Sequence, residues 1–289
     1  MKTPKEEILE FMKERPETEA VIGYGSGINP QRGQENRKPQ IDLIVVVDDL
    51  KKWHALNIKK NPKDYSFSGK LFFKYAPKKW LKSGGKITYM TYIPFNGSKY
   101  KIGTIEKVDF LNDLKNWETF YIAGRMQKPI LVVSAPEDIE SAIEYNRHAG
   151  LLSTELLLGK GEFDEEYFYT ILAGLSYIGD TRMGIAENPD KVLNIVKGRF
   201  DFYQDVYGSQ LKIKDNMVIV PEENMETLPD DLHLYLENYK GNIGDGIREF
   251  LTRKNKSQSM AQTIKGLFTT GPIKSIKYVS EKLKRRKRK

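Results

Sequence analysis

The stretch AVIGYGSG at residues 20–27, followed by IDLIVVVDD at residues 41–49, decides the fold. The first stretch is typical of a strand that runs directly into a turn, because its last two glycines permit a sharp change of direction. The second is a nearly continuous β-branched run, which is typical of a strand buried on both faces of a central sheet. Asp42 is the one acid within residues 41–47. Together the two stretches predict an α/β fold organised around a sheet.

The pattern changes near residue 135. Strand-like runs occupy residues 86–94 and 100–108, and residues 111–126 are helical in period. Beyond Pro136, helix is expected to follow helix to about Tyr207. We therefore predict an α/β domain with a mixed sheet at residues 1–135, a mostly helical domain at residues 136–246 and a basic C-terminal segment at residues 247–289.

Composition excludes several classes of protein. The chain has 289 residues, enough for two domains. Its 39% hydrophobic content is that of a globular protein and excludes a disordered or fibrous one. It has no Cys, which excludes a disulfide scaffold, a thiolate nucleophile and a zinc–thiolate site. Its three His are too few for a His-based metal cluster. A reducing compartment is the expectation.

Positive charge is concentrated at the C-terminal end. Residues 248–289 hold 14 Lys+Arg and 2 Glu, a net charge of +12, whereas the whole chain carries +8 and the remainder therefore −4. Ile276, Val279 and Leu283 fall at helical spacing among these lysines, which is typical of an amphipathic segment on an anionic membrane. A solvated tail or an RNA-binding end is the alternative, but we expect no stable nucleic-acid partner.

Membrane spans and targeting segments are not expected. The longest apolar run, residues 43–47, is far shorter than the ~18 residues of a membrane span. The first residues, MKTPKEEILEF, mix acids with bases and lack the order of a signal or transit peptide. A cytoplasmic start is the expectation.

A strand, a Gly-Ser turn, a long loop and a second strand bearing an acid form the sequence signature of a nucleotidyltransferase. Such a site holds a nucleoside triphosphate by backbone N–H groups and a hydroxyl at a tight turn, and holds Mg²⁺ by carboxylates. We expect Gly25, Ser26 and Gly27 to cradle the phosphates and Asp42 to bind the metal. The alternative is a plain glycine turn beside a strand with one buried, hydrogen-bonded Asp.

The second acid of this signature is missing from the strand. It usually lies two residues from the first, but these positions hold Gln40 and Ile44. Asp48 shares the strand face of Asp42, yet six residues of strand separate the two by roughly 20 Å. A second metal ligand must come from another segment, and the sequence does not separate the candidates Glu106, Asp109 and Asp180.

Further segments extend the match over nearly the whole chain. They are YGSG at 24–27, DLIVVVDD at 42–49, WHALN at 53–57, NPKDYS at 61–66, YKIG at 100–103, YIAGRMQKP at 121–129, LSYIGDTRM at 175–183, ENPDKVLNIV at 187–196 and KGLFTTGPIKS at 265–275. In this order they resemble the mitochondrial-type CDP-diacylglycerol synthases, the translocator assembly and maintenance family of phosphatidate cytidylyltransferases. The chain departs from the family's K-Y-G segment at Ile102 and Thr104.

The resemblance implies a reaction in phospholipid biosynthesis. CTP and phosphatidate would give CDP-diacylglycerol and pyrophosphate, with Mg²⁺ as cofactor, at a membrane surface. It also implies a nucleotidyltransferase domain with a mixed sheet, then a smaller winged-helix-like domain, and a C-terminal segment that associates with an anionic membrane. Without leader features, a prokaryotic-like member is expected, cytoplasmic and peripheral on the inner face of the cell membrane. The oligomeric state stays open.

Basic side chains are assigned to the phosphates. Lys101 is expected to bind the triphosphate, although strand lysines more often face solvent. Arg182, Arg125 and Lys128 are expected to bind phosphate or lipid, and structural ion pairs are the alternative. Asp180 either completes the metal site or only orients Arg182.

Two tyrosines and a histidine remain. Tyr24 and Tyr65 are candidates to stack on or hydrogen-bond the cytosine, with ordinary core aromatics as the stronger alternative. His54 is interpreted as a hydrogen-bonded structural residue, with catalysis as the alternative.

Three functions compete on these grounds. The first is a phosphatidate cytidylyltransferase that depends on CTP and Mg²⁺. The second is a nucleotidyltransferase acting on another small molecule or on RNA. The third is an inactive lipid-binding scaffold, which the lack of an acid close to Asp42 keeps open.

Overall fold

A computed structural model describes residues 2–29, 40–180, 190–221 and 227–270. Its main sheet has five strands in the order β3-β4-β2-β1-β5. β1 lies antiparallel to β2 and β5, β2 lies parallel to β4, and β3 lies antiparallel to β4, so the mixed sheet predicted from sequence is confirmed. These strands are β1 (Ala20–Tyr24), β2 (Ile41–Val47), β3 (Thr88–Phe95), β4 (Ser98–Glu106) and β5 (Ile130–Ser134).

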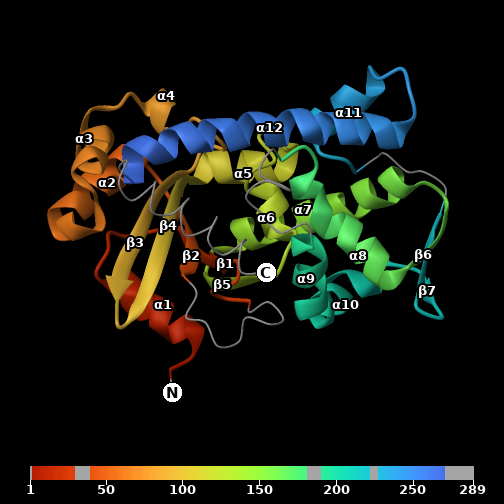
Figure 1. The fold of residues 1–289 in the computed structure, drawn as a ribbon, viewed down its shortest axis with the longest axis horizontal. Helices are drawn as coiled ribbons and strands as arrows, with labels where there is room; N and C mark the ends of the chain where they lie inside the picture. The colour runs from red at the N-terminus through yellow and green to blue at the C-terminus, as the bar shows by residue number, and fades with distance from the viewer. Residues whose placement is uncertain (1, 30–39, 181–189, 222–226, 271–289) are drawn as a thin grey trace.

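Helices surround this sheet and form most of the chain after it (Figure 1). The α-helices are α1 (Pro4–Lys13), α2 (Leu50–Lys60), α3 (Phe67–Tyr75), α4 (Lys78–Leu81), α5 (Lys107–Asn116), α6 (Ala123–Met126), α7 (Glu137–Leu158), α8 (Glu165–Gly174), α9 (Lys191–Gly198), α10 (Phe200–Tyr207), α11 (Asp230–Glu237) and α12 (Ile243–Thr270). Single 3₁₀ turns are η1 (Pro62–Asp64), η2 (Leu175–Tyr177) and η3 (Gly208–Gln210). A small sheet of order β6-β8-β7 joins β6 (Gly161–Asp164), β7 (Ile213–Lys214) and β8 (Met217–Val220).

The helix predicted over residues 111–126 is wrong as a single element. α5 ends at Asn116, and Trp117 takes a left-handed conformation with φ of 57°. The buried carboxylate of Asp113 collects the backbone N–H groups of Thr119, Phe120, Ile122 and Ala123, which turns the chain before α6 begins. The helical period of the sequence does not show this, because the turn depends on a buried side chain.

The two faces of the main sheet pack against different helices. Ile22, Ile44 and Ile105 point to one face and join a core that includes residues of α5, α7 and α8. Val45 and Ile102 point to the other face and join a core with α1, α2 and α3. The alternation follows from the pleat of the strands, in which successive side chains point to opposite faces.

α12 links the two halves of the molecule. It contacts α7 and α11 near one end and β3 and α3 near the other, and Figure 1 shows it crossing above them. At 1.5 Å per residue its 28 residues span about 42 Å. It begins before residue 247, and one core runs from β1 to α12, so the domain divisions at residues 135 and 246 stay predictions. No helix within the described ranges is long and apolar enough to cross a bilayer.

Candidate active site

A row of three polar side chains crosses the centre of the main sheet. Tyr24 at the end of β1 lies opposite Asp42 on β2, and Asp42 lies beside Lys101 on β4. Directly paired residues share one face of a sheet, so the three side chains project together. The next row inward is Ile22, Ile44 and Gly103, which is buried. The polar row therefore lies at the border of the core.

The Gly-Ser-Gly turn packs closely against the start of β2. Gly25 has φ of +75°, and a side chain there would lie 3.3 Å from a carboxylate oxygen of Asp42. At Gly27 a Cβ atom would lie 2.3 Å from the carbonyl oxygen of Gln40, so only glycine fits. The carbonyl of Gly25 accepts bonds from the N–H groups of Ile28 and Asn29, which makes one helical turn. The first N–H groups of such a turn are available to an anion.

Lys101 is held in the site as a cation. Its Nζ lies 4.1 Å from the centre of the Tyr89 ring, and the absence of a side chain at Gly103 gives that ring its place. Burial disfavours the charged amine, but the surrounding tyrosine oxygens and the Asp42 carboxylate outweigh it and raise the pKa of Lys101 well above its ordinary value. A half-buried cation beside a carboxylate is suited to a polyanionic ligand.

Arg125 supplies a second cation from α6. Its guanidinium stacks 3.7 Å from the centre of the Tyr121 ring and donates a hydrogen bond to the Tyr121 carbonyl. Burial opposes its charge, but the neighbouring tyrosines, Tyr24 among them, raise the pKa of Arg125 above its ordinary value. Arg125 therefore faces the same space as the polar row.

Lys128 and its neighbours extend the basic side of the site. Its amine donates to the hydroxyl of Ser176 and lies 4.7 Å from the centre of the Tyr177 ring, with Lys191 5.1 Å from the same ring. Arg199 donates to the side-chain oxygen of Asn29 at 2.5 Å. That contact ties the end of the Gly-Ser-Gly turn to the helical half of the molecule.

The structure separates the candidates for a second metal ligand. Glu106 pairs with Val47 at the far end of the strands, five residues or roughly 16 Å from the Asp42 row. It bonds Lys78 and Lys82, and Asp109 bonds Lys82 and Lys86, so both acids belong to a structural ion network. Asp180 accepts a bond from Ser259 of α12 at 3.3 Å. Arg182 lies outside the described residues.

Asp42 is the acid that the structure places in the polar row. It accepts a hydrogen bond from the Gln40 side chain at 2.9 Å and is partly exposed. No group of three or more acidic or His side chains that could hold a metal occurs in the described ranges. Mg²⁺ commonly binds through one or two carboxylates together with substrate phosphates, so this donor set fits the ion only in the presence of a phosphate ligand.

His54 and Tyr65 lie on the opposite face of the sheet from Lys101. The His54 ring is fully buried, with Nδ1 2.9 Å from the Tyr65 hydroxyl and Nε2 2.8 Å from the Thr104 hydroxyl. Thr104 points away from the polar row because odd and even positions of β4 face opposite ways. Both residues therefore belong to the core here, as interpreted for His54 and as the stronger alternative had it for Tyr65.

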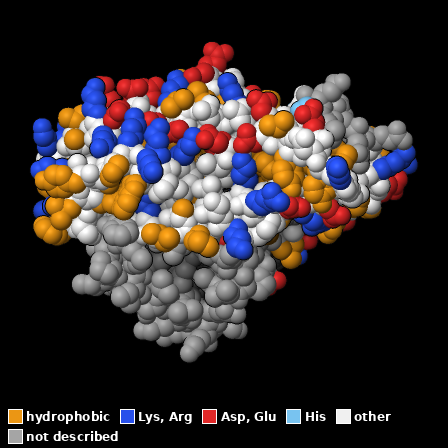
Figure 2. Space-filling model, turned by 90° about the horizontal axis from the view of Figure 1, so that it is seen from above, with side chains coloured by type: hydrophobic (Ala, Val, Ile, Leu, Met, Phe, Trp, Pro, Cys, Tyr) orange, Lys and Arg blue, Asp and Glu red, His pale blue; other side chains and the backbone are white. Residues whose placement is uncertain are grey.

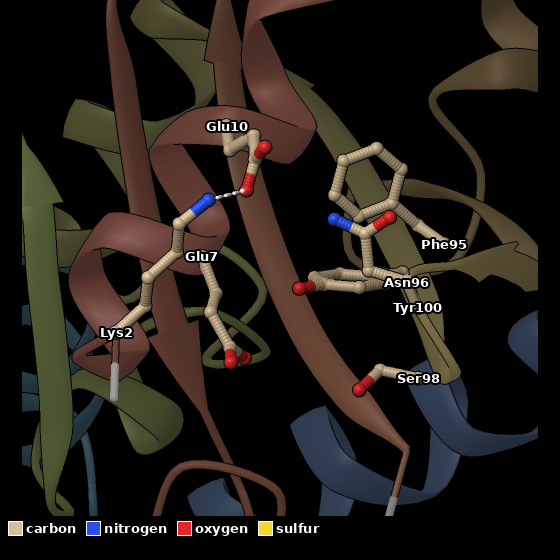
Figure 3. Close-up of a pocket in the computed structure, with 7 residues that line it drawn as sticks. All are labelled: Lys2, Glu7, Glu10, Phe95, Asn96, Ser98 and Tyr100. Atoms are coloured by element: carbon tan, nitrogen blue, oxygen red, sulfur yellow. Dashed lines mark hydrogen bonds and ion pairs between the residues drawn. The ribbon is translucent and has the colours of Figure 1, made fainter.

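One hollow on the surface is unrelated to the polar row. It lies between α1 and the β3–β4 hairpin, and Figure 3 shows Phe95 and Tyr100 beside the ion pair of Lys2 with Glu10. Its volume is about 70 Å³, too small for a nucleotide.

Tyr89, Tyr121 and Asn29 were missed by sequence reasoning. Tyr89 and Tyr121 surround the cations, and Asn29 anchors the turn. Tyr121 belongs to the YIAGRMQKP segment, which was a usable signal. No signal in the sequence pointed to Tyr89, since its position depends on how β3 pairs with β4.

Comparison with known proteins assigns the chain to a family. The family model described as "Phosphatidate cytidylyltransferase, mitochondrial" matches residues 6–238 and 233–285. The chain belongs to this family. The two matched ranges contain every residue of the polar row, and also Arg125 and Lys128 beside it.

Curated relatives carry the same name. The protein of Bos taurus is 32% identical over 304 residues, with 92% of this chain and 90% of its own length covered. The protein of Saccharomyces cerevisiae is 36% identical over 276 residues, with 93% and 67% covered. Among solved structures, a nucleotidyltransferase-like protein from Exiguobacterium sibiricum matches at 10% identity and a TM-score of 0.27, over 92% of this chain and 77% of that one.

Family membership corrects one expectation. The sequence predicted a cytoplasmic protein at the inner face of a cell membrane, whereas the relatives are named as mitochondrial enzymes. That expectation of location is wrong. Its basis was the composition of the first residues, which is a weak guide to location.

Proposed function

We propose that this chain is a phosphatidate cytidylyltransferase, which converts CTP and phosphatidate to CDP-diacylglycerol and pyrophosphate. Family membership gives the class of enzyme. The single observation that supports the proposal within the structure is the row of Tyr24, Asp42 and Lys101 beside the Gly-Ser-Gly turn. The names of the relatives favour a mitochondrial location for this activity.

The chemistry requires charge neutralisation more than proton transfer. An oxygen of the phosphatidate phosphate attacks the α-phosphorus of CTP, and the bond from that phosphorus to the pyrophosphate oxygen breaks. The attacking oxygen is already anionic, so no strong general base is needed, and positioning and electrostatics dominate. A site with two half-buried cations, Lys101 and Arg125, suits such a reaction.

Each residue of the site has a proposed role. Gly25, Ser26 and Gly27 offer backbone N–H groups and a hydroxyl to the triphosphate, and Tyr24 borders the nucleotide. Lys101 neutralises the charge on the phosphates of CTP.

The metal and the lipid phosphate are assigned to other side chains. Asp42 would hold Mg²⁺, which when bound would offset the negative charge of the phosphates. Asp180 stays a candidate second ligand. Arg125 and Lys128 are proposed to bind the lipid phosphate, together with Arg182. The basic C-terminal segment is proposed to hold the enzyme on an anionic membrane.

The test is pyrophosphate release from CTP in the presence of phosphatidate vesicles and Mg²⁺. Asp42→Asn should abolish release, and Asp48→Asn, an exposed acid just beyond the same strand, should leave it intact. Release that needs no phosphatidate would favour the nucleotidyltransferase with another acceptor. Vesicle binding without any pyrophosphate release would favour the inactive scaffold.

A further inference from the structure

The outer face of α3 is apolar although it is exposed. Phe67, Leu71 and Tyr75 recur every four residues and are 80%, 45% and 67% exposed. The inner face holds Gly69 and Phe73, which are buried against α12 and the core. A helix that is apolar on both sides is typical of an element with a second partner.

Two neighbouring helices continue this face. Trp80 on α4 is 53% exposed, and Ile264 on α12 is 56% exposed. The three helices are packed as one unit, because the Ser66 hydroxyl donates to the carbonyl of Thr269 at 3.1 Å and the Lys265 amine donates to the carbonyl of Leu81 at 2.8 Å. The exposed apolar side chains of α3 and α4 are called the α3–α4 surface: Phe67, Leu71, Tyr75 and Trp80.

Lysines surround the α3–α4 surface. Residues 51–82 contain ten Lys and one acid, Asp64, a net charge of +9, and two of these lysines, Lys78 and Lys82, pair with acids outside this range. Asp64 is buried in an ion pair with Arg15 at 2.9 Å, so it does not offset the lysines at the surface. Lys74 on α3 is exposed, and its amine lies 5.1 Å from the centre of the Tyr75 ring. Figure 2 shows hydrophobic and basic side chains gathered at the end of the molecule where Figure 1 places α3.

We propose that the α3–α4 surface docks onto an anionic lipid bilayer, independently of the basic C-terminal segment. Exposed aromatic side chains among lysines are suited to the headgroup region of such a bilayer. The proposal rests on the proposed function, since it specifies where the enzyme meets the surface that holds its lipid substrate. α12 lies against α3 at this surface, where the Ser66 hydroxyl donates to the Thr269 carbonyl.

The positive charge around the α3–α4 surface favours an anionic bilayer over other partners for this surface. The C-terminal segment and a second copy of the α3–α4 surface are both basic, so each would be repelled by the lysines around the apolar side chains. An anionic membrane attracts the lysines and covers the apolar side chains at the same time.

Trp80 reports on this contact directly. The chain has three Trp, and the other two, Trp53 and Trp117, are 3% and 0% exposed. With the full chain, vesicles of phosphatidylcholine and phosphatidylglycerol should shift the Trp emission to shorter wavelength and protect it from iodide. Vesicles of phosphatidylcholine alone should not. Sedimentation with anionic vesicles while the emission stays unchanged would overturn the proposal, because the C-terminal segment alone would then bind.

Variants supply a matched comparison. Phe67→Ser with Leu71→Ser and Tyr75→Ser should weaken vesicle binding by about tenfold or more. Val108→Ser with Leu234→Ser, at exposed apolar positions on α5 and α11, should bind as the parent chain does. Equal binding by both variants would refute the proposal.

Activity is measured separately on short-chain phosphatidate dispersed in detergent. Both variants should retain parental turnover there, which shows that they fold. If the parent is inactive in that assay yet Trp80 still responds to vesicles, the proposed function fails and the docking surface stands.

Discussion

Replacement of Asp113 tests whether one buried carboxylate builds the turn that carries Arg125. Its two oxygens accept five hydrogen bonds over 2.6–3.1 Å: four from backbone N–H groups and one from the Thr119 hydroxyl. The residue is 1% exposed, so water does not replace these bonds. Asp113→Asn keeps one acceptor oxygen and turns an NH₂ group toward two of the donors.

The expected cost follows from that arrangement. A hydrogen bond to a charged group contributes about 1.5–3 kcal/mol, and buried donors left without an acceptor cost a similar amount. With at least two bonds lost and the rest not additive, Asp113→Asn should lower the free energy of unfolding by about 3–5 kcal/mol. That is a large fraction of the ~5–15 kcal/mol that stabilises an ordinary domain.

Urea unfolding followed by tryptophan emission measures this loss, because Trp117 lies within the turn and is fully buried. The urea concentration at the midpoint of unfolding should fall, while the slope of the free energy of unfolding against urea concentration stays unchanged. Asp48→Asn, at an exposed position, is the control and should change stability by less than about 0.5 kcal/mol. A loss below about 1 kcal/mol for Asp113→Asn would refute the reasoning, since the five bonds would then contribute little.

Three further predictions concern Lys101, His54 and Gly27. Lys101→Met should lower kcat by about a hundredfold or more, while Lys99→Met, at an exposed position of the same strand, keeps parental kcat in the pyrophosphate assay. Burial lowers the pKa of His54 to about 3, so only the unfolded chain takes up its proton below about pH 6.5, and stability should fall by about 2 kcal/mol between pH 6.5 and 5. Urea unfolding at both pH values should show this loss in the parent and not in His54→Gln. Gly27→Ala should abolish CTP binding in calorimetry, because its Cβ would meet the Gln40 carbonyl at 2.3 Å.

The sequence predicted what depends on local pattern. β1, its turn and β2 follow from runs of apolar residues and glycine chemistry, and the structure places them as expected. The sequence assigned Tyr24, Asp42 and Lys101 to one nucleotide, but their alignment in one row depends on the pairing of β1, β2 and β4, which the sequence did not predict.

Pairing and burial decided what the sequence could not. Tyr89 reaches Lys101 only through the register of β3 on β4, which no periodicity encodes. Trp117 breaks a helical pattern because a buried Asp113 organises the chain after it. Glu106 was a plausible metal ligand until its strand position placed it at the other end of the sheet.

The net charge of the chain also conceals local differences, and these differences connect the proposed function with the proposed docking surface. The body of the chain before residue 248 carries −4, a sum that conceals +9 in residues 51–82. With +12 in residues 248–289, the remainder of the chain holds −13. Ser66 bonds Thr269 near the C-terminal end of α12, so the basic region of residues 51–82 lies beside that end of the helix. An anionic bilayer would attract that end and repel the rest, which would orient the enzyme before any apolar side chain is buried.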